Sequence, residues 1–265
     1  MRRVRDATSI LTMCLGLGFG MSCKVRASDV IPVIAAASDL QFALTAVADA
    51  FRKETGKDVR IAFGSSGNFA RQIRLKAPFQ IFFSADEDYV LALSREGFTS
   101  DDGVVYAIGR LALVVPRNSS IMADSALVDV GVGLKDGRLK RFAIANPEHA
   151  PYGKRAQEVL ERAGLWQSIK DKLVLGENVS QAGQFAISGS TDGGIIAYSL
   201  ALSPKISDVA HTILLPETLH SALRQRMVLL KDAGEIAQSF YAFAGGVTAR
   251  EIFGSFGFVR PDGSR

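Results

Sequence analysis

The chain has 265 residues, with 31 Lys and Arg against 27 Asp and Glu, but the positive excess lies at its N-terminus. The first 27 residues hold five of the basic residues and one of the acidic residues, so 26 of each remain in the rest of the chain. A remainder near neutrality offers no basic surface for nucleic acid or an anionic membrane, and we expect neither as a partner. Both cysteines, Cys14 and Cys23, fall in the same N-terminal stretch, which leaves the remainder without a disulfide or a thiol nucleophile.

Residues 1–27 have the pattern of a secretory signal peptide. Three arginines within the first five residues precede an apolar run, residues 10–21, that is too short to span a bilayer. We expect cleavage near Ala27 and a periplasmic protein. Lipid anchoring at Cys23 is less favoured, because Gly20 stands where a lipobox has Leu. The remaining residues suffice for one large α/β domain or for two lobes.

Short apolar runs alternate with amphipathic segments along the chain, which predicts an α/β fold. In the first part we expect helices from about Asp39 to Gly56, at 68–76 and at 86–96, and strands at 30–36, 59–63, 79–84, 104–108 and 111–115. In the second part we expect helices at 154–163, at 235–244, at 248–256 and one ending near 187, and strands at 141–145, 173–175, 194–198 and 227–230.

Familiar enzyme motifs are incomplete in this sequence. The Gly-Ser-Ser-Gly loop at 64–67 lacks the lysine of a phosphate-binding loop and the spacing of a nucleophile elbow. The run GVGLKDG at 131–137 misses the dinucleotide fingerprint and predicts a turn-rich connection. The acidic run 86–88 favours a carboxylate-rich helix start over a cation site. A secreted serine hydrolase that uses Ser66 with His149 as its base is an alternative hypothesis.

Polar or helix-initiating residues follow four of the expected strands. Ser38 follows the first strand and Ser65-Ser66 the second, while Pro151-Tyr152-Gly153 and Asn178-Val179-Ser180 follow strands of the second part. Each stands where a helix is expected to begin, and the first turn of a helix has free backbone N–H groups with partial positive charge. One such junction alone is explained by helix capping. Four of them at the carboxyl ends of strands predict an anion site built from neutral donors.

Six segments together resemble the periplasmic molybdate-binding proteins of ABC importers: AAASDL (35–40), AFGSSGNFARQI (62–73), IFFSADEDY (81–89), NPEHAPYG (146–153), GENVSQ (176–181) and EIFGSFGF (251–258). The resemblance implies the two-lobed periplasmic-binding-protein fold of type II, with mixed sheets flanked by helices and two crossover strands. It implies a monomeric binding protein without enzymatic activity or cofactor. Molybdenum would enter only as the molybdate anion.

By this resemblance, Ser38 and Ser66 would donate hydroxyl and backbone N–H hydrogen bonds to the anion, and Tyr152 and Val179 would donate backbone N–H groups. Asp39 is a possible further contact through its backbone N–H, with its side chain turned away, since a carboxylate repels a dianion.

Tyr198 is the other possible contact. It stands one position later than the tyrosine of the family pattern, and alternation along a strand would turn it to the opposite face. The Tyr152 hydroxyl is an alternative donor.

The resemblance also predicts the division of the chain and its role. Lobe 1 is expected at 28–112 and 230–265, lobe 2 at 113–229, with crossovers near 111–115 and 227–230. The protein would capture molybdate, and also tungstate, between its lobes and deliver it to a membrane permease. The same architecture could hold another oxyanion such as sulfate or phosphate.

Overall fold

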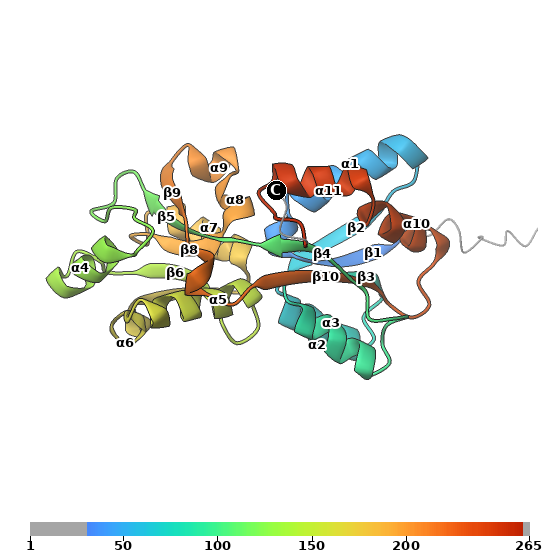
Figure 1. Ribbon diagram of the computed structural model, residues 1–265, viewed down its shortest axis with the longest axis horizontal. Helices are drawn as coiled ribbons and strands as arrows, with labels where there is room; N and C mark the ends of the chain where they lie inside the picture. The colour runs from blue at the N-terminus through green and yellow to red at the C-terminus, as the bar shows by residue number, and fades with distance from the viewer. Residues whose placement is uncertain (1–30, 262–265) are drawn as a thin grey trace, which may run out of the picture.

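The computed structural model describes residues 31–261 and divides them into two halves placed side by side (Figure 1). Each half contains one five-stranded sheet with helices packed against it. The expected signal peptide, its cleavage near Ala27 and the alternative lipid site at Cys23 lie outside the described residues. The expected fold class, two lobes with mixed sheets flanked by helices, is confirmed.

The sheet of the first half combines parallel and antiparallel pairs. Its strand order is β2-β1-β3-β10-β4, in which β1 runs parallel to β2 and β3, and β10 runs antiparallel to β3 and β4. The interior strand β1 is apolar and buried beyond its first residue, as a parallel strand covered on both faces requires. The strands are β1 (Val33–Ala37), β2 (Arg60–Gly64), β3 (Phe79–Ser84), β4 (Val104–Gly109) and β10 (Leu223–Leu229).

Helices cover both faces of this first sheet, and on each face the helices and the sheet enclose a separate apolar core. On one face the core is aromatic: Phe240 packs edge-on against Phe51 at 5.2 Å between ring centroids. On the other face Phe69 and Val90 join a smaller core. The helices of the first face are α1 (Ala43–Thr55), α10 (Glu235–Ala244) and α11 (Val247–Ser255), those of the second are α2 (Ser66–Arg74) and α3 (Glu87–Arg95), and a 3₁₀ turn, η2 (Ser38–Leu40), precedes α1.

The second half repeats the arrangement with the strand order β7-β6-β8-β5-β9. Strand β6 runs parallel to β7 and β8, whereas β5 runs antiparallel to β8 and β9. The strands are β5 (Leu111–Pro116), β6 (Phe142–Ala145), β7 (Leu173–Gly176), β8 (Gly194–Ala197) and β9 (Ala210–Leu214). The helices are α4 (Val128–Asp136), α5 (Pro151–Arg162), α6 (Trp166–Ile169), η3 (Lys170–Lys172), α7 (Val179–Ile187), α8 (Tyr198–Ala201), α9 (Pro204–Ser207) and η4 (Glu217–Leu219).

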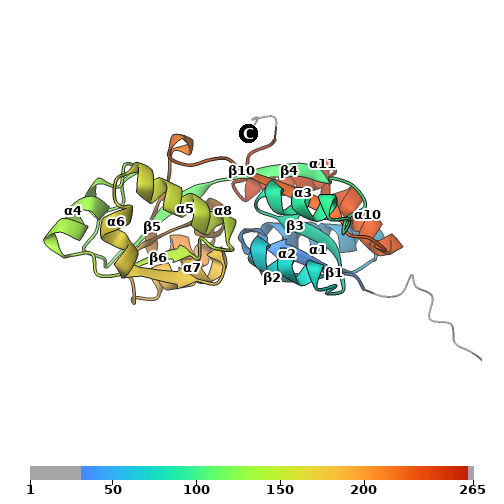
Figure 2. The same ribbon diagram turned by 90° about the horizontal axis from the view of Figure 1, so that it is seen from below.

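Two connections join the halves. The first is immediate, because β4 ends at Gly109 in one sheet and β5 begins at Leu111 in the other. The second is residues 215–222, between β9 and β10. Both run along one edge of the molecule (Figure 2). The expected boundary at 229/230 is therefore too late, since β10 already pairs within the first sheet, and the expected crossover at 111–115 lies wholly within the second sheet.

Two local expectations also change. Residues 131–137 are not a turn-rich connection: α4 continues to Asp136, and Gly137 ends it with a φ of +80°. The helices expected from residues 68 and 154 begin earlier, at Ser66 and Pro151. In residues 31–261, the helices are all too short or too polar to cross a membrane.

Candidate anion site between the halves

Four of the residues expected at the site line one cavity between the two halves. Ser38 and Ser66 come from the first half, and Tyr152 and Val179 from the second. The rest of the lining is Ala37, Asp39, Gly64, Ser65, Ala85, Ala150 and Pro151. The cavity volume is about 10 Å³, far below the roughly 300–1,000 Å³ of pockets that hold drug-sized ligands. In this closed conformation the space is about what one water molecule needs.

The lining residues are held at the ends of strands and the starts of helices. Ser38 directly follows β1. Ser66 is the first residue of α2, and Ser65 alone separates it from the end of β2. Tyr152 is the second residue of α5, and Val179 is the first residue of α7. Backbone N–H groups in a first helical turn have no acceptor within their own helix. Donors from both halves therefore converge without Lys or Arg in the lining.

The hydroxyls of Ser38 and Ser66 are both oriented by backbone N–H groups. The N–H of Ser180 donates to Ser38 Oγ at 3.2 Å, and the N–H of Ala85 donates to Ser66 Oγ at 3.0 Å. A hydroxyl that accepts such a bond still has its own proton to donate. Within residues 31–261 neither hydroxyl proton has an acceptor, so both can donate to an anion.

Asp39 belongs to the cavity lining, and its carboxylate contacts Gln225 on β10, a strand of the same half. Its Oδ2 accepts a hydrogen bond of 2.5 Å from the Nε2 amide of Gln225, and its side chain is buried. The backbone carbonyl of Asp39 accepts from Ser199 Oγ at 2.8 Å. Burial raises the pKa of Asp39 to about 6, although the Gln225 amide and the Tyr152 hydroxyl lower it in part.

The hydroxyl groups of Tyr198 and Tyr152 do not point a free donor into the cavity in this structure. Tyr198 is absent from its lining, because β8 ends at Ala197 and Tyr198 begins α8, where its ring packs under the Arg110 guanidinium at 4.7 Å. The Tyr152 hydroxyl instead accepts from Gln225 Nε2 at 3.1 Å and is buried. Tyr198 therefore lies outside the cavity lining in this structure, and Tyr152 would serve through its backbone.

Direct hydrogen bonds hold the halves together around the cavity. The N–H of Gly67 donates to the carbonyl of His149 at 2.9 Å, and Ser65 Oγ lies 3.0 Å from His149 Nδ1. A β-carbon at Gly67 would lie 2.6 Å from that carbonyl oxygen, so the close approach requires glycine. The structure is thus a closed conformation, in which the two backbones touch.

The serine hydrolase hypothesis loses its proposed pair of residues. His149 contacts Ser65 rather than Ser66, whose hydroxyl accepts from the Ala85 backbone instead. Since Ser65 and His149 belong to different halves, their contact forms when the halves meet and serves closure. The small cavity beside them leaves no room for an ester substrate.

Two other features of the described residues lack the character of an anion or metal site. A larger cavity of about 280 Å³ lies between Gln41 and helices α7 to α9, but its lining mixes apolar and polar side chains without converging donors. Among the described residues, no cluster of three or more His, Cys, Asp or Glu side chains is placed to hold a metal ion. The acidic run 86–88 is instead engaged by arginines, with Glu87 bonded to Arg224 and Arg226.

Sequence reasoning missed three residues around the cavity. The sequence pattern indicated neither Ser65 nor His149 as a contact between the halves, but their side chains meet there. Gln225 was not singled out, although it is fully buried and joins Asp39 to Tyr152. The signal for Gln225 was present: a lone amide at an inward position of the apolar, alternating run of β10.

Comparison with known proteins agrees with this geometry. A sequence model of the bacterial extracellular solute-binding protein family matches residues 32–259. The molybdate-binding protein ModA of Rhodobacter capsulatus is 33% identical over 248 residues, covering 92% of this chain and 94% of the relative, and ModA of Azotobacter vinelandii is 32% identical over 94% and 97%. The solved periplasmic molybdate-binding protein of Azotobacter vinelandii superimposes with a TM-score of 0.78 at 29% identity, over 88% of this chain and all of that one. The chain therefore belongs to the bacterial extracellular solute-binding proteins, and within them to the group of its ModA relatives.

Proposed function

We propose that this protein captures molybdate, and tungstate with it, in the cavity between its halves and delivers the anion to the membrane permease of an ABC importer. The observation that carries the proposal is the convergence of donors: two serine hydroxyls with free protons and the first turns of three helices meet in one small cavity. The curated relatives that cover nearly the whole chain are molybdate-binding proteins. The protein binds its ligand without turnover and needs no cofactor.

Closure follows from the division of the donors between the halves. Ser38 and Ser66 lie in the first half, and Tyr152 and Val179 in the second, so an anion contacts the full set in the closed conformation alone. A ligand with higher affinity for one conformation shifts the protein toward it. The permease then recognises the closed form.

Selectivity rests on neutral donors and a fixed cavity. Molybdate and tungstate have nearly the same size and charge, and we expect both to bind. Sulfate is smaller and would leave some of the converging donors unpaired, which disfavours it.

The test is a titration of the metal-free mature protein with molybdate, tungstate, sulfate and phosphate, read by calorimetry and thermal unfolding. We expect binding and stabilisation by the first two anions. The S38A/S66A double variant should bind molybdate about 100-fold or more weakly, since each lost bond to a charged group is worth roughly 1.5–3 kcal/mol. The S168A/S207A variant, which removes two exposed hydroxyls of the second half, should bind normally. Full affinity in S38A/S66A would refute the site, and no response to any of the four anions would refute the function.

We also propose that the protein works outside the cytoplasm as a monomer, with its N-terminus processed near Ala27 and without a lipid at Cys23. Intact-mass spectrometry of the exported protein distinguishes these cases, because cleavage before Cys23 would leave a longer, lipid-modified chain. Light scattering of the mature protein gives the oligomeric state.

A further inference from the structure

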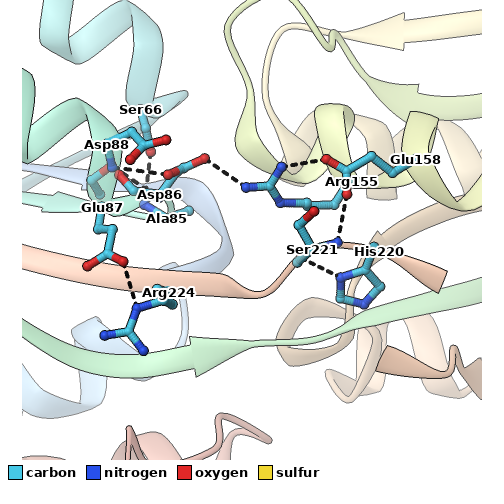
Figure 3. Close-up of polar contacts among 11 residues, drawn as sticks. Ser66, Ala85, Asp86, Glu87, Asp88, Arg155, Glu158, His220, Ser221 and Arg224 are labelled. Carbon is cyan, nitrogen blue, oxygen red and sulfur yellow. Dashed lines mark hydrogen bonds and ion pairs between the residues drawn. The ribbon is translucent and has the colours of Figure 1, made fainter. Parts of the chain in front are cut away.

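A buried ion pair joins the two halves beside the anion cavity (Figure 3). Arg155, on α5 of the second half, donates from Nη2 to Oδ2 of Asp86 in the first half at 3.1 Å. The two side chains are only 9% and 10% exposed. Because the partners come from different halves, the pair exists only when the halves are together.

The Asp86 carboxylate is fixed independently of Arg155. Its Oδ1 caps α3 by accepting from the Asp88 N–H at 3.1 Å, and its backbone carbonyl accepts from Ser84 Oγ at 2.6 Å. The preceding residue, Ala85, donates its N–H to the Ser66 hydroxyl of the candidate site. The carboxylate that meets Arg155 is therefore rigidly connected to the donors around the cavity.

Arg155 stands between two carboxylates that closure brings together (Figure 3). Its Nη1 donates to Oε1 of Glu158 at 2.6 Å, one turn further along α5. The other oxygen of Glu158 accepts from the Ser221 N–H at 2.7 Å, which ties it to the second connection between the halves. Without the guanidinium, closing the halves would press Asp86 and Glu158 toward each other with little water to screen them.

We propose that Arg155 is a positioning residue for anion capture, whose cross-connection from Glu158 to Asp86 holds the closed conformation without touching the anion. The inference rests on the proposed function and deepens it. In an open conformation Arg155 keeps its hydrogen bond to Glu158, because both residues lie on α5. Closure then adds the contact with Asp86. A contact made in one conformation raises the population of that conformation, and with it the apparent affinity for a ligand that requires it.

The test compares R155Q, D86N and the double variant of the mature protein. D86N keeps a good helix-capping residue at the start of α3. Neither R155Q nor D86N changes a residue that lines the cavity. Molybdate affinity is measured by calorimetry. Closure is measured separately, as the distance between labels on cysteines placed at the exposed residues Lys53 and Lys135, one in each half of a chain that has no cysteine after Cys23.

We expect R155Q and D86N to bind molybdate about 10- to 100-fold more weakly than the wild type. Both should shift the label distances toward the open form. The double variant should bind molybdate no more weakly than R155Q alone, because the two substitutions remove the same contact. R155K, which restores the charge without the planar fork, should recover part of the affinity.

A matched control is R138Q, which removes an arginine paired with Asp129 at 2.8 Å within the second half. It should change neither affinity nor distance. Wild-type affinity in R155Q and D86N, additive losses in the double variant, or losses without a change in label distance would each overturn the proposal. If the wild type binds none of the oxyanions, the proposed function fails instead, and unchanged label distances in the ligand-free variants would still reject the role of Arg155.

Discussion

Replacing Asp39 by asparagine tests the burial of a carboxylate beside an anion cavity. Burial raises the pKa of Asp39 from 3.8 to about 6, against a partial lowering by the Gln225 amide and the Tyr152 hydroxyl. Asparagine has the same shape, stays neutral and can still accept the hydrogen bond of 2.5 Å that Gln225 donates. A difference of about two pKa units corresponds to about 3 kcal/mol between the protonated and ionised forms.

The sign of the effect follows from proton binding. The folded protein holds the Asp39 proton more tightly than the unfolded chain does, since its folded pKa is the higher one. The favourable contribution is therefore fully present below pH 3.8 and is lost as the pH rises through about 6. D39N carries no such dependence, so we expect it to match the wild type near pH 4 and to exceed its stability by up to about 3 kcal/mol above pH 7.

The assay is urea unfolding of the ligand-free mature protein and of D39N at intervals from pH 4 to pH 8. The difference between the two free energies of unfolding cancels the titration of the other groups. D49N provides the control, because Asp49 is an exposed carboxylate on α1 of the same half. A difference between D39N and the wild type that stays constant with pH would refute the inference that this carboxylate is buried in the free protein.

Three further substitutions address closure, capping and the core. G67A would put a methyl group 2.6 Å from the His149 carbonyl oxygen, so calorimetry should show weaker molybdate binding, while thermal unfolding stays at or above wild type because alanine favours a helix by about 1 kcal/mol. N178A removes the side chain that accepts two N–H groups at the start of α7, and urea unfolding should show a loss of about 1 kcal/mol. F240A removes a ring packed on Phe51, and the same assay should show a loss of about 3–5 kcal/mol.

A specific result would contradict each of these three predictions. Wild-type affinity in G67A would mean that the anion-bound halves stand further apart than in this structure. An unchanged stability of N178A would mean that α7 is held by packing alone. A loss below about 1 kcal/mol in F240A would contradict the close packing of the aromatic core, because truncating a well-packed buried Phe costs about 3–5 kcal/mol.

Much of the architecture could be predicted because the most buried strands are apolar along their whole length. The apolar run of β1 is buried on both faces, and the serines and helix starts after β1, β2, β6 and β7 mark carboxyl ends of parallel strands. Such ends meet at one edge of a sheet, so residues distant in sequence could be placed together. Four expected residues indeed line one cavity. That they bind molybdate is the proposal above.

The misplaced boundary before residue 230 has a physical origin in β10. Its inward-facing positions are Leu223, Gln225 and Met227, and the buried amide at the centre interrupts the apolar pattern. Between them Arg224 and Arg226 pair with Glu87, outside the core. The apolar run is therefore shorter than the strand, because Gln225 serves the polar contact between the halves rather than the core.

Helix α4 was missed for a related reason. Its glycines suggest a turn, but Gly133 is buried within the helix, and the Ile121 side chain occupies the space that a β-carbon would take. Packing against a neighbour outweighed the low helix propensity of glycine, which costs about 1 kcal/mol relative to alanine. The sequence shows the low helix propensity of glycine, but it does not show which side chain packs against the glycine in the fold.

The contacts between the halves form the part that no local pattern could supply. Asp86 is fully explained as a helix cap, and the Arg155–Glu158 pair as neighbours on one helix. Because each residue has a sufficient explanation within its own half, nothing in the sequence indicates that they meet. The meeting depends on how the two sheets are placed by the short connection at residues 109–111 and the longer one at 215–222. The two proposals thus rest on different information: the donors proposed for the anion follow from junctions that the sequence shows, whereas the proposed closing contacts follow from the placement of the halves.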